Sequence, residues 1–414
     1  MAAAAVKNVA IVTPWFPTRE LPFRGAFVRA MVEATAPGCD LMTVYHCDAW
    51  VAKLSNRGDA LVSEANQALL RRTMGPVPTV GGAQLLHIPV PIPRGRWHAE
   101  IAHRQSSTLR TALGGKPIEA PIVHAHVGLP GGWAALHNAR PDAKVYVTEH
   151  ATFLDSVLDS EQAREMYDEV LTRCAGFYAV GEAVRGPLLE AFPHHADRIE
   201  FIANPINFEV ARTAPVTDLR RWLYVGGLIE RKGVELLLEA FATCRADDPS
   251  LTLTMVGTGD LLVRLTERAD ELGVADAVTF TGAVPPEEAL RAMREHDLLV
   301  HPSRMETFGV TVIEALAAGM PVLVTRCGGP EETLAGIEDA AGELIEVTDD
   351  PATIVEGYRR LRDRFPHGTD VARARDRLAA RYSYRSVADA HHGIWFPDSP
   401  PLVPAGSERL AGRK

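Results

Sequence analysis

Short runs of β-branched and aliphatic residues recur along this chain, and helical patterns separate most of them. The first half contains NVAIVT, DLMTVYH, AQLLHIP, PIVHAH, AKVYVT and AGFYAV, and the pattern restarts later with RWLYVGG, LTLTMVG, AVTFTG, DLLVHPS and PVLVT. Strands that are apolar on both faces and alternate with helices are typical of parallel sheets covered on both sides. The pattern predicts an α/β protein with two doubly wound, Rossmann-like domains. Ligands of such folds bind outside the carboxyl ends of the strands, so the cleft between the domains is the expected site.

The same pattern divides the chain. Residues 1–210 form the predicted N-terminal domain, residues 211–220 a linker and hinge, and residues 221–380 the C-terminal domain. A final helix is expected at 381–398, packing back on the N-terminal domain, and the Pro-, Ser- and Gly-rich end at 399–414 is expected to be a mobile tail. A length of 414 residues fits two domains, because it exceeds what one core usually organises.

Composition excludes several classes of protein. Hydrophobic residues make up 46% of the chain and charged residues 23%, as in ordinary globular proteins. No run reaches the roughly 18 apolar residues of a membrane-spanning helix, and the N-terminus leads directly into the first strand, so we expect a cytoplasmic protein without membrane association. The five cysteines are scattered without a C-x-x-C pair, which favours neither disulfides nor a zinc site. A net charge of −10 argues against nucleic acid and is compatible with a neutral or cationic small substrate, or with solubility alone.

One predicted helix contains a carboxylate that its neighbours do not explain. In METFGVTVIEAL the side chains from Val310 onward are apolar around nearly the whole circumference, except for Glu314. A carboxylate taken out of water requires an ion-pair partner, a shifted pKa or a ligand with hydroxyl groups. Glu306 precedes the helix in the loop after DLLVHPS, which faces the predicted cleft. The alternative is that Glu314 pairs with a core arginine while Glu306 is solvated.

A second stretch, YVGGLIERKGVELLLEAF, predicts a strand, a glycine-containing loop and a helix. The loop carries two glycines and two adjacent cations, namely Gly226, Gly227, Arg231 and Lys232. Free backbone N–H groups and the helix dipole favour an anion at such a place, and Lys232 would supply a point charge on a phosphate. A solvated Arg-Lys pair at a turn is the alternative.

Together these stretches resemble the family 4 glycosyltransferases, which are retaining enzymes of the GT-B fold. The resemblance covers most of the chain and rests on HPSRMETFGVTVIEALAAGMPVLVTRCGGPEETL, VGGLIERKG, PIVHAHVGLPGG, VTEHATF and TPWFPTRELPFRGAFV. It implies that the C-terminal domain binds a nucleoside-diphosphate sugar and that the N-terminal domain binds the acceptor.

The resemblance also implies roles for individual residues of the C-terminal domain. Glu314 would accept hydrogen bonds from the ribose hydroxyls, Glu306 would lie at the donor sugar, and Lys232 would bind the diphosphate. The other donor-binding positions that it implies are Gly226, Gly227, Arg231, Thr281, Gly282, Val284, Thr307, Phe308, Gly309 and Val310.

In the N-terminal domain, the resemblance assigns two further residues. His150 of VTEHATF would reach the reacting sugar and phosphate from across the cleft, and Gly25 of PFRGAFV would line the acceptor side and touch the diphosphate. His124 and His126 alternate along one strand and so share one face. We interpret this pair as structural, because no further metal ligands can be identified for it.

Two positions depart from the family's pattern. Gly227 stands where an arginine usually follows the glycine of the phosphate loop, so one positive charge on the diphosphate is missing, and either Arg231 or backbone amides could compensate. Pro205 replaces the glycine of a P-N-G segment after Asn204, which leaves the acceptor-side geometry open.

The mechanism that the resemblance implies is a front-face substitution with retention. No residue offers itself as a covalent nucleophile, so the leaving diphosphate is expected to help deprotonate the acceptor hydroxyl. Catalysis would depend on His150, Glu306 and Lys232 through positioning and electrostatics. The nucleotide sugar is the expected co-substrate, with no other cofactor and no metal.

The acceptor is the least defined part of this prediction. Asp48, Glu149 and Asp155 would suit a polyol or an aminated sugar, and we expect a saccharide or aminocyclitol, in antibiotic or other secondary metabolism, that receives a hexose from UDP rather than GDP. The basic segment at 91–110, with Trp97, would instead suit a lipid-linked or cell-envelope acceptor. A GT-B-type phosphorylase that uses inorganic phosphate, and a nucleotide-sugar-binding protein without turnover, are the other open classes.

Overall fold

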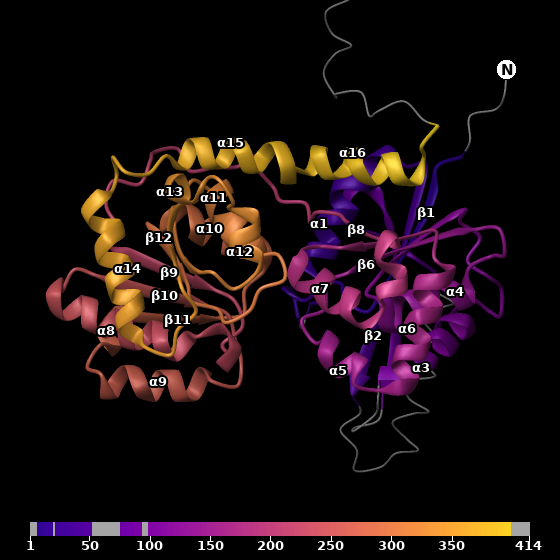
Figure 1. The fold of residues 1–414 in the computed structure, drawn as a ribbon, viewed down its shortest axis with the longest axis horizontal. Coiled ribbons are helices and arrows are strands. Elements are labelled where there is room, and N and C mark those ends of the chain that lie inside the picture. Colours follow the sequence, from indigo (N-terminus) through magenta and orange to yellow (C-terminus); the bar gives the residue numbers. More distant parts are fainter. Residues whose placement is uncertain (1–5, 20, 52–74, 93–97, 399–414) are drawn as a thin grey trace, which may run out of the picture.

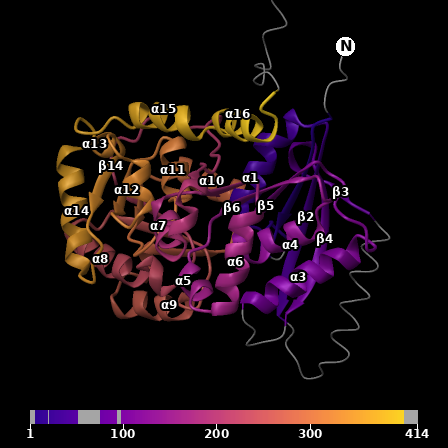
Figure 2. The ribbon, with the colours of Figure 1, turned by 45° about the vertical axis from the view of Figure 1, so that its right-hand side comes forward.

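The protein consists of two α/β units, each built on its own sheet (Figure 1 and Figure 2). The computed structural model describes residues 6–19, 21–51, 75–92 and 98–398. The predicted fold class is confirmed, and the predicted linker at 211–220 lies between the last strand of the first sheet and the first strand of the second.

The first sheet has the strand order β3-β4-β2-β1-β5-β6-β7-β8, with every neighbouring pair parallel except β3 and β4. Its central strands are almost entirely buried, which explains their continuous apolar sequences. The strands are β1 (Asn8–Thr13), β2 (Leu41–Val51), β3 (Val77–Pro78), β4 (Gln84–Ile92), β5 (Ile122–His126), β6 (Lys144–Glu149), β7 (Gly176–Ala179) and β8 (Ile199–Phe201).

The second sheet has the order β11-β10-β9-β12-β13-β14 and is parallel throughout. Its strands are β9 (Arg221–Val225), β10 (Thr252–Val256), β11 (Val278–Gly282), β12 (Leu298–His301), β13 (Val322–Thr325) and β14 (Gly342–Ile345). In both sheets the order reverses beside the first strand, between β1 and β5 and between β9 and β12. Loops that leave the carboxyl ends of these strands are where ligands of doubly wound folds bind.

Helices cover both faces of the sheets. They are α1 (Ala26–Thr35), α3 (His98–Ala112), α4 (Trp133–Asn138), α5 (Leu154–Leu158), α6 (Glu161–Arg173), α7 (Glu182–Ala191), α8 (Val234–Asp247), α9 (Leu262–Glu271), α10 (Pro286–Glu295), α11 (Val310–Ala317), α12 (Gly329–Thr333), α13 (Glu338–Ala341), α14 (Pro351–Arg364), α15 (Val371–Tyr382) and α16 (Tyr384–Trp395). Short helical turns are η1 (Ala36–Gly38), η2 (Val80–Gly82), η3 (Gly128–Gly132), η4 (Pro193–Arg198), η5 (Glu230–Lys232) and η6 (Ala275–Ala277).

The last two helices connect the two units along one side of the molecule. Figure 1 shows α15 over the C-terminal unit and α16 over the N-terminal unit, in yellow. On α16, Trp395 is buried and its indole Nε1 donates a hydrogen bond to Nδ1 of His124 at 3.0 Å. The carbonyl oxygen of Ile394 accepts a hydrogen bond from Tyr146 Oη at 3.2 Å. The chain therefore returns to the first unit after completing the second.

Three strands have no counterpart in the sequence prediction. Strand β3 has only two residues, and in β8 only Ile199 is buried, so neither produces an apolar run. Strand β14, with the sequence GELI, contains a glycine and a glutamate. Three helices, α14, α15 and α16, end the described chain, and the last two follow capping residues, Asp370 and Ser383, whose side chains accept backbone hydrogen bonds.

Candidate active site

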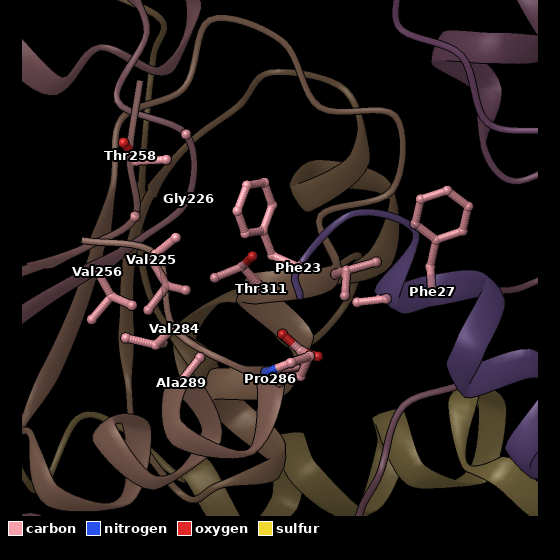
Figure 3. A pocket seen from close by; sticks show the side chains of 16 residues that line it. Phe23, Phe27, Val225, Gly226, Val256, Thr258, Val284, Pro286, Ala289 and Thr311 are labelled. Atoms are coloured by element: carbon pink, nitrogen blue, oxygen red, sulfur yellow. The ribbon is translucent and has the colours of Figure 1, made fainter. Parts of the chain in front are cut away.

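A pocket of about 270 Å³ lies where the two units meet. The N-terminal unit contributes Phe23, Ala26 and Phe27, at and before the start of α1. The C-terminal unit contributes the loops after β9, β10 and β11 and the start of α11, so that Phe23 and Phe27 face side chains of the other unit across the pocket (Figure 3). Of the predicted donor-binding residues, those that line the pocket are Gly226, Gly227, Val284, Val310 and Glu314.

Glu314 is the acidic residue of this pocket. Most of α11 is buried in the core, for example Ile313 and Leu316, whereas Glu314 is half-buried and reaches the pocket together with Val310 and Thr311. Within the described ranges its carboxylate forms no hydrogen bond or ion pair, so the alternative of a core arginine partner does not apply there. Desolvation raises the pKa of Glu314 to about 7. The Glu314 carboxylate can therefore accept hydrogen bonds from a ligand, because no described protein group donates to it.

The wall opposite α1 consists of close-packed backbone. Gly257 has a φ of 144°, and a Cβ there would lie 1.8 Å from the carbonyl oxygen of Gly226. Gly226 N donates to Val256 O, and Gly257 N donates to Gly282 O, both at 2.9 Å. Gly282 thus supports the pocket from behind, while Ala283 and Val284 line it. Only glycine permits two strand-end loops to approach so closely and leave room for a ligand.

The predicted pair Lys232 and Glu306 is joined directly. Lys232 Nζ forms an ion pair with Glu306 Oε1, and the same oxygen lies 2.8 Å from Nε2 of His301. Burial alone would raise the pKa of Glu306, but the hydrogen bond from His301 and the charge of Lys232 outweigh it and hold the pKa well below its usual range. Glu306 is consequently a fixed anion.

His301 was not among the predicted site residues. It ends β12, is buried, and stacks on Tyr224 with ring centroids 5.5 Å apart. Its position in DLLVHPS, five residues before Glu306, is the signal that could have identified it, because the chain turns back at the strand end.

Arg231 connects the two loops at the point where the second sheet reverses its order. Its guanidinium Nη1 donates to the carbonyl oxygen of Met305, and its own carbonyl oxygen accepts from Arg304 N at 2.8 Å. The Nη1 group is thus bound to the Met305 carbonyl oxygen, and Arg231 does not line the pocket.

Of the remaining predicted positions in the second unit, Thr307, Phe308 and Gly309 lie at the start of α11, whereas Thr281 is exposed on β11. Gly309 caps the helix with a φ of 79°, and Phe308 is buried against Tyr382 with ring centroids 5.2 Å apart. Thr307 lies against the other unit, because a Cβ on Gly181 would lie 2.4 Å from its carbonyl oxygen. Thr281 Oγ1 donates to Gly282 O at 3.0 Å. The loop between Glu306 and α11 is thus the second surface at which the units touch.

Gly25 determines where α1 begins. It has a φ of 72°, and a Cβ there would lie 2.5 Å from the carbonyl carbon of Trp15. The loop after β1 can fold onto itself only with glycine at this place, and that fold directs Ala26 and Phe27 to the pocket. Gly25 itself does not line the pocket.

His150 lies behind the pocket wall formed by Phe27. The two rings are in contact, with centroids 4.5 Å apart and planes inclined by 34°. His150 Nε2 lies 2.9 Å from Nδ1 of His126, so His126, predicted as structural, contacts the predicted catalytic histidine. Burial lowers the pKa of His150 to about 3, which keeps the ring neutral.

Glu149 has a different role from the acceptor-binding one considered above. Its Oε2 accepts from Gly128 N at 2.7 Å and from Tyr167 Oη at 2.6 Å. Its Oε1 accepts from the backbone N–H groups of His150 and Ala151, at 2.9 and 2.8 Å. Burial nevertheless raises its pKa, with these four hydrogen bonds acting in the opposite direction. Glu149 fixes the backbone that carries His150.

Other acceptor-side predictions have mixed outcomes. Asp48 Oδ2 lies 3.1 Å from His87 Nε2, and Asp48 Oδ1 lies 3.4 Å from Arg24 Nη1. Asp155 is exposed on α5. Residues 93–97 of the basic segment, among them Arg94, Arg96 and Trp97, lie outside the described residues. Arg104 pairs with Glu100, and Arg110 donates to His137 O. Across the described ranges, no helix is both long and apolar enough to cross a membrane.

Comparison with known proteins identifies the family of this site. The model described as "Glycosyltransferase Family 4" matches residues 62–210, and the model described as "Glycosyl transferases group 1" matches residues 207–364. A glycogen synthase of Mycobacterium tuberculosis (strain CDC 1551 / Oshkosh) is 28% identical over 301 residues, which are 66% of this chain and 68% of the relative. A D-inositol 3-phosphate glycosyltransferase of Corynebacterium urealyticum is 34% identical over 172 residues, or 40% of each chain.

Solved structures agree with this at the level of the fold. Sucrose-phosphate synthase from Thermosynechococcus elongatus superimposes with a TM-score of 0.68 at 18% identity, covering 94% of this chain and 98% of that one. HepE of Anabaena in complex with UDP and glucose gives 0.65 at 17% identity, covering 93% and 98%. Two matched family models that together extend from residue 62 to residue 364, and the GT-B architecture, lead to one conclusion. The chain belongs to the family 4 glycosyltransferases, GT-B enzymes that transfer a sugar from a nucleotide sugar.

Proposed function

We propose that this enzyme transfers a hexosyl group from a UDP-sugar to a hydroxyl group of a polar saccharide or cyclitol acceptor, with retention of anomeric configuration. The observation that carries the nucleotide part is Glu314. Its carboxylate lines a pocket between the units and lacks a hydrogen-bond donor among the described residues. A ribose supplies two adjacent hydroxyl donors, which would replace the water that such a carboxylate loses on burial.

The chemistry around Glu314 supports a diphosphate beside the ribose. Gly226 and Gly227 expose backbone on one side of the pocket, and α11 begins at Val310 on the other side. Backbone N–H groups at a helix N-terminus favour an anion, and Lys232 follows in the same loop as the two glycines. UDP is the preferred nucleotide because a GT-B neighbour, HepE, was solved with UDP and glucose.

The state of Glu306 supports a substitution with retention in which the leaving diphosphate acts as the base. Lys232 and His301 hold it as an anion in a fixed position, so it is suited to orient a sugar and to stabilise positive charge at the anomeric carbon. A carboxylate whose pKa is held low is a weak base, so Glu306 is poorly suited to take the proton of the acceptor hydroxyl. The leaving diphosphate would then take the proton of the acceptor hydroxyl.

A hydroxyl-rich acceptor is favoured by two observations. The N-terminal unit places Asp48, His87 and Arg24 together near the loop that carries Phe23. Relatives include a glycogen synthase and a D-inositol 3-phosphate glycosyltransferase, which by their names act on a glucan and a cyclitol phosphate. A role in antibiotic or other secondary metabolism stays a prediction from the sequence.

Nucleotide binding is the first test. Calorimetric titration of UDP, GDP, ADP and inorganic phosphate should show preferential binding of UDP to the wild-type protein. Glu314→Gln removes the charge at nearly constant volume and should weaken UDP binding by roughly tenfold or more, the value of one charge-assisted hydrogen bond. If phosphate alone binds, the phosphorylase becomes the better account; if UDP binds equally to both proteins, Glu314 does not hold the ribose.

Turnover separates the remaining alternatives. Incubation with UDP-glucose and a panel of saccharides, inositols and aminocyclitols should yield a glycoside, whose anomeric configuration is read by NMR. A product of inverted configuration would contradict retention. Tight UDP binding with no transfer to any acceptor of the panel, including lipid-linked ones, would favour a nucleotide-sugar-binding protein.

A further inference from the structure

His150 is held in place through both its backbone and its ring. Its backbone N–H donates to Glu149 Oε1 at 2.9 Å, and Glu149 is itself fixed by Tyr167 and Gly128. Its ring Nε2 lies 2.9 Å from His126 Nδ1, and Phe27 covers one ring face. The other ring nitrogen of His150, Nδ1, is buried without a partner among the described residues.

The hydrogen bond between the two histidines permits two arrangements of protons, because burial keeps both rings neutral. In the first, His126 donates from Nδ1, so His150 carries its proton on Nδ1. In the second, His150 donates from Nε2, and His126 carries its proton on Nε2. His126 Nε2 is also buried without a partner among the described residues. The second arrangement thus leaves an N–H group unpaired behind the site whether or not substrate is bound.

The first arrangement also leaves one buried N–H group unpaired in the free enzyme, but it places that group on His150, where substrate can accept from it. It leaves only a lone pair on His126 Nε2, and unpaired buried acceptors are less rare in proteins than unpaired buried N–H groups. The one unsatisfied N–H group is then His150 Nδ1–H, on the ring that lies against the pocket-lining Phe27. Oxygens of a sugar or a phosphate can accept from it, so substrate satisfies the group that the free enzyme leaves unpaired.

We propose that His126 is a positioning residue that fixes His150 as the Nδ1–H tautomer, and that His150 acts on an oxygen of the donor substrate through Nδ1–H as a hydrogen-bond donor. Glu149 completes this arrangement by holding the backbone of His150. Both the contact of His150 with substrate and the reason for preferring this tautomer rest on the proposed function, because without substrate each arrangement leaves one buried N–H group unpaired.

The tautomer is measurable without substrate. Nitrogen-15 NMR of histidine-labelled protein distinguishes protonated from bare ring nitrogens, and the His150 signals are identified by their loss in His150→Gln. We expect a protonated Nδ1 and a bare Nε2 in the wild-type protein. A protonated Nε2 would overturn the proposal, and this result needs no variant at position 126 to fold.

Two variants of His126 separate positioning from packing. His126→Asn places an amide nitrogen close to the position of the imidazole Nδ1 and keeps a donor, whereas His126→Leu keeps bulk but no donor. We expect the Asn variant to retain the Nδ1–H tautomer, and the Leu variant to lose it and to lower kcat by about 10- to 100-fold with little change in the KM of the donor. Equal kcat in the two variants would show that His126 only packs.

This design distinguishes the two possible failures. If UDP does not bind but the wild-type tautomer is as expected, the proposed function fails and the positioning of His150 stands. If UDP binds and the tautomer is reversed, the proposed function stands and the positioning fails.

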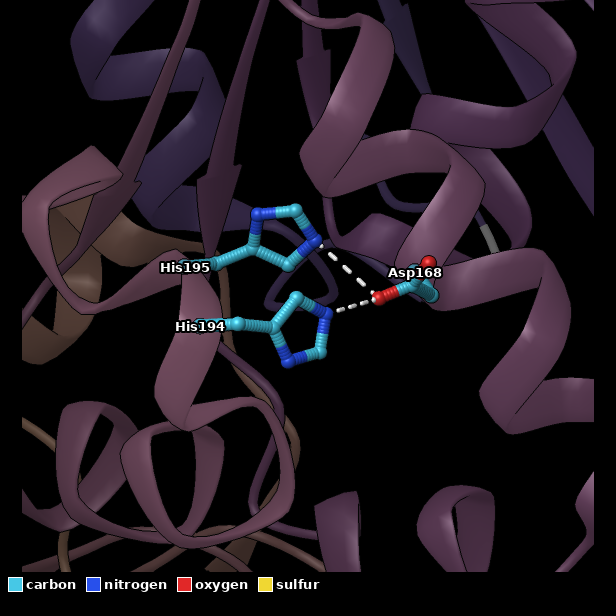
Figure 4. A group of neighbouring side chains, drawn as sticks. All are labelled: Asp168, His194 and His195. Atoms are coloured by element: carbon cyan, nitrogen blue, oxygen red, sulfur yellow. Dashed lines mark hydrogen bonds and ion pairs between the residues drawn. The ribbon is translucent and has the colours of Figure 1, made fainter.

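A second cluster, in which none of the residues lines the pocket, carries an independent inference. Asp168 on α6 faces two adjacent histidines of η4, His194 and His195 (Figure 4). Both imidazole Nε2 atoms lie near the same carboxylate oxygen, Asp168 Oδ1, at 2.7 Å for His194 and 3.0 Å for His195. One candidate ligand atom from each residue lies within 4.8 Å of the others.

The chemistry of this cluster matches a zinc site with an open position. Zinc bonds of about 2.0–2.2 Å in a tetrahedron place ligand atoms about 3.4 Å apart, so Asp168 Oδ1 has to move away from the two imidazole nitrogens by about 0.4 to 0.7 Å. His195 is 10% exposed and therefore fixed, whereas the side chains of His194 and Asp168 are 61% and 42% exposed and can adjust. The two imidazole rings lie 4.3 Å apart, so one ion can reach a nitrogen of each.

We infer that Asp168, His194 and His195 bind a divalent zinc ion, with water as a further ligand, and that the ion joins α6 to the segment before β8. Calorimetric titration of zinc chloride into chelator-treated protein should show one bound equivalent. His194→Ala, at an exposed position, should weaken this binding at least about tenfold. His367→Ala, which removes an exposed histidine elsewhere, should leave it unchanged. Absence of a stoichiometric site, or equal affinity in His194→Ala, would overturn the inference.

Discussion

The ionisation of Glu314 links its position in the pocket to the stability of the protein. Desolvation raises its pKa in the folded protein to about 7, above the ordinary value of 4.5. The folded state therefore binds this proton more tightly than the unfolded state, and ionisation opposes folding. The resulting loss of stability begins near pH 4.5, increases as the pH rises, and is complete above about pH 7.

Glu314→Gln should remove this dependence. Denaturant unfolding of both proteins between pH 5 and pH 8 should show that the variant gains stability relative to the wild type as the pH rises, because the amide has no proton to lose. A difference in unfolding free energy that stays constant over this range would show that Glu314 is well solvated. Saturating UDP should reduce the difference if the ribose hydroxyls compensate the charge.

Lys232→Ala should lower turnover by roughly 100-fold or more, the scale of a lost electrostatic stabiliser in a transferase site. The variant also leaves Glu306 with His301 as its remaining partner, so donor binding and circular dichroism have to be measured beside the rate. Lys116→Ala removes an exposed lysine and serves as the matched control. Full turnover of Lys232→Ala would remove Lys232 from the catalytic residues.

At the scale of secondary-structure elements, the packing of α6 on the carboxyl end of β6 holds the loop that carries His150. Tyr167 on α6 donates to Glu149 at the end of β6, and Gly128 at the start of η3 donates to the same carboxylate. Three segments that are separate in sequence are thus joined by one buried side chain. This explains why Glu149 precedes His150 directly.

Tyr167→Phe tests this connection. The variant removes one of the four hydrogen bonds to a buried carboxylate and should cost about 1–3 kcal/mol of unfolding free energy, measured with urea. Tyr178→Phe is a control, because the Tyr178 hydroxyl forms no hydrogen bond with the described residues. Similar costs for the two variants would mean that the Glu149 hydrogen bonds do not stabilise the loop.

At the scale of the whole molecule, α15 and α16 make the N-terminal unit depend on the end of the chain. Trp395 on α16 belongs to a core cluster with β1 and β2, residues close to the other end of the sequence. Direct polar contacts between the units include the exposed Arg29–Glu287 ion pair at 2.6 Å, which is worth under about 1 kcal/mol. The helical connection thus adds a buried link between the units to this exposed ion pair.

Trp395→Ala should destabilise the protein by about 3–5 kcal/mol, the usual cost of removing a buried tryptophan, and should also leave His124 Nδ1 without its donor. Thermal and urea unfolding measure this cost. Phe201→Ala, at a side chain that is 51% exposed, should cost far less. A small effect of Trp395→Ala would show that α16 is dispensable for the N-terminal unit.

The sequence by itself determined the two parallel sheets, the glycine loops at their strand ends, and Glu314 as an unusual carboxylate on an apolar helix. These features depend on periodicity and on residue types within one segment, which a sequence displays directly. Short edge strands such as β8 were missing from the sequence prediction, because they bury too few side chains to produce a pattern.

The tertiary structure determined which residues contact the side chains of the site. Gly128 and Tyr167 at Glu149, Lys232 at Glu306, His126 at His150, and Phe27 between His150 and the pocket all join different segments of the chain. Hydrogen bonds and burial depend on distances between segments far apart in the chain, and the residue types in one segment leave those distances undefined. The charge of Glu306, the neutrality of His150 and the free carboxylate of Glu314 follow from that packing.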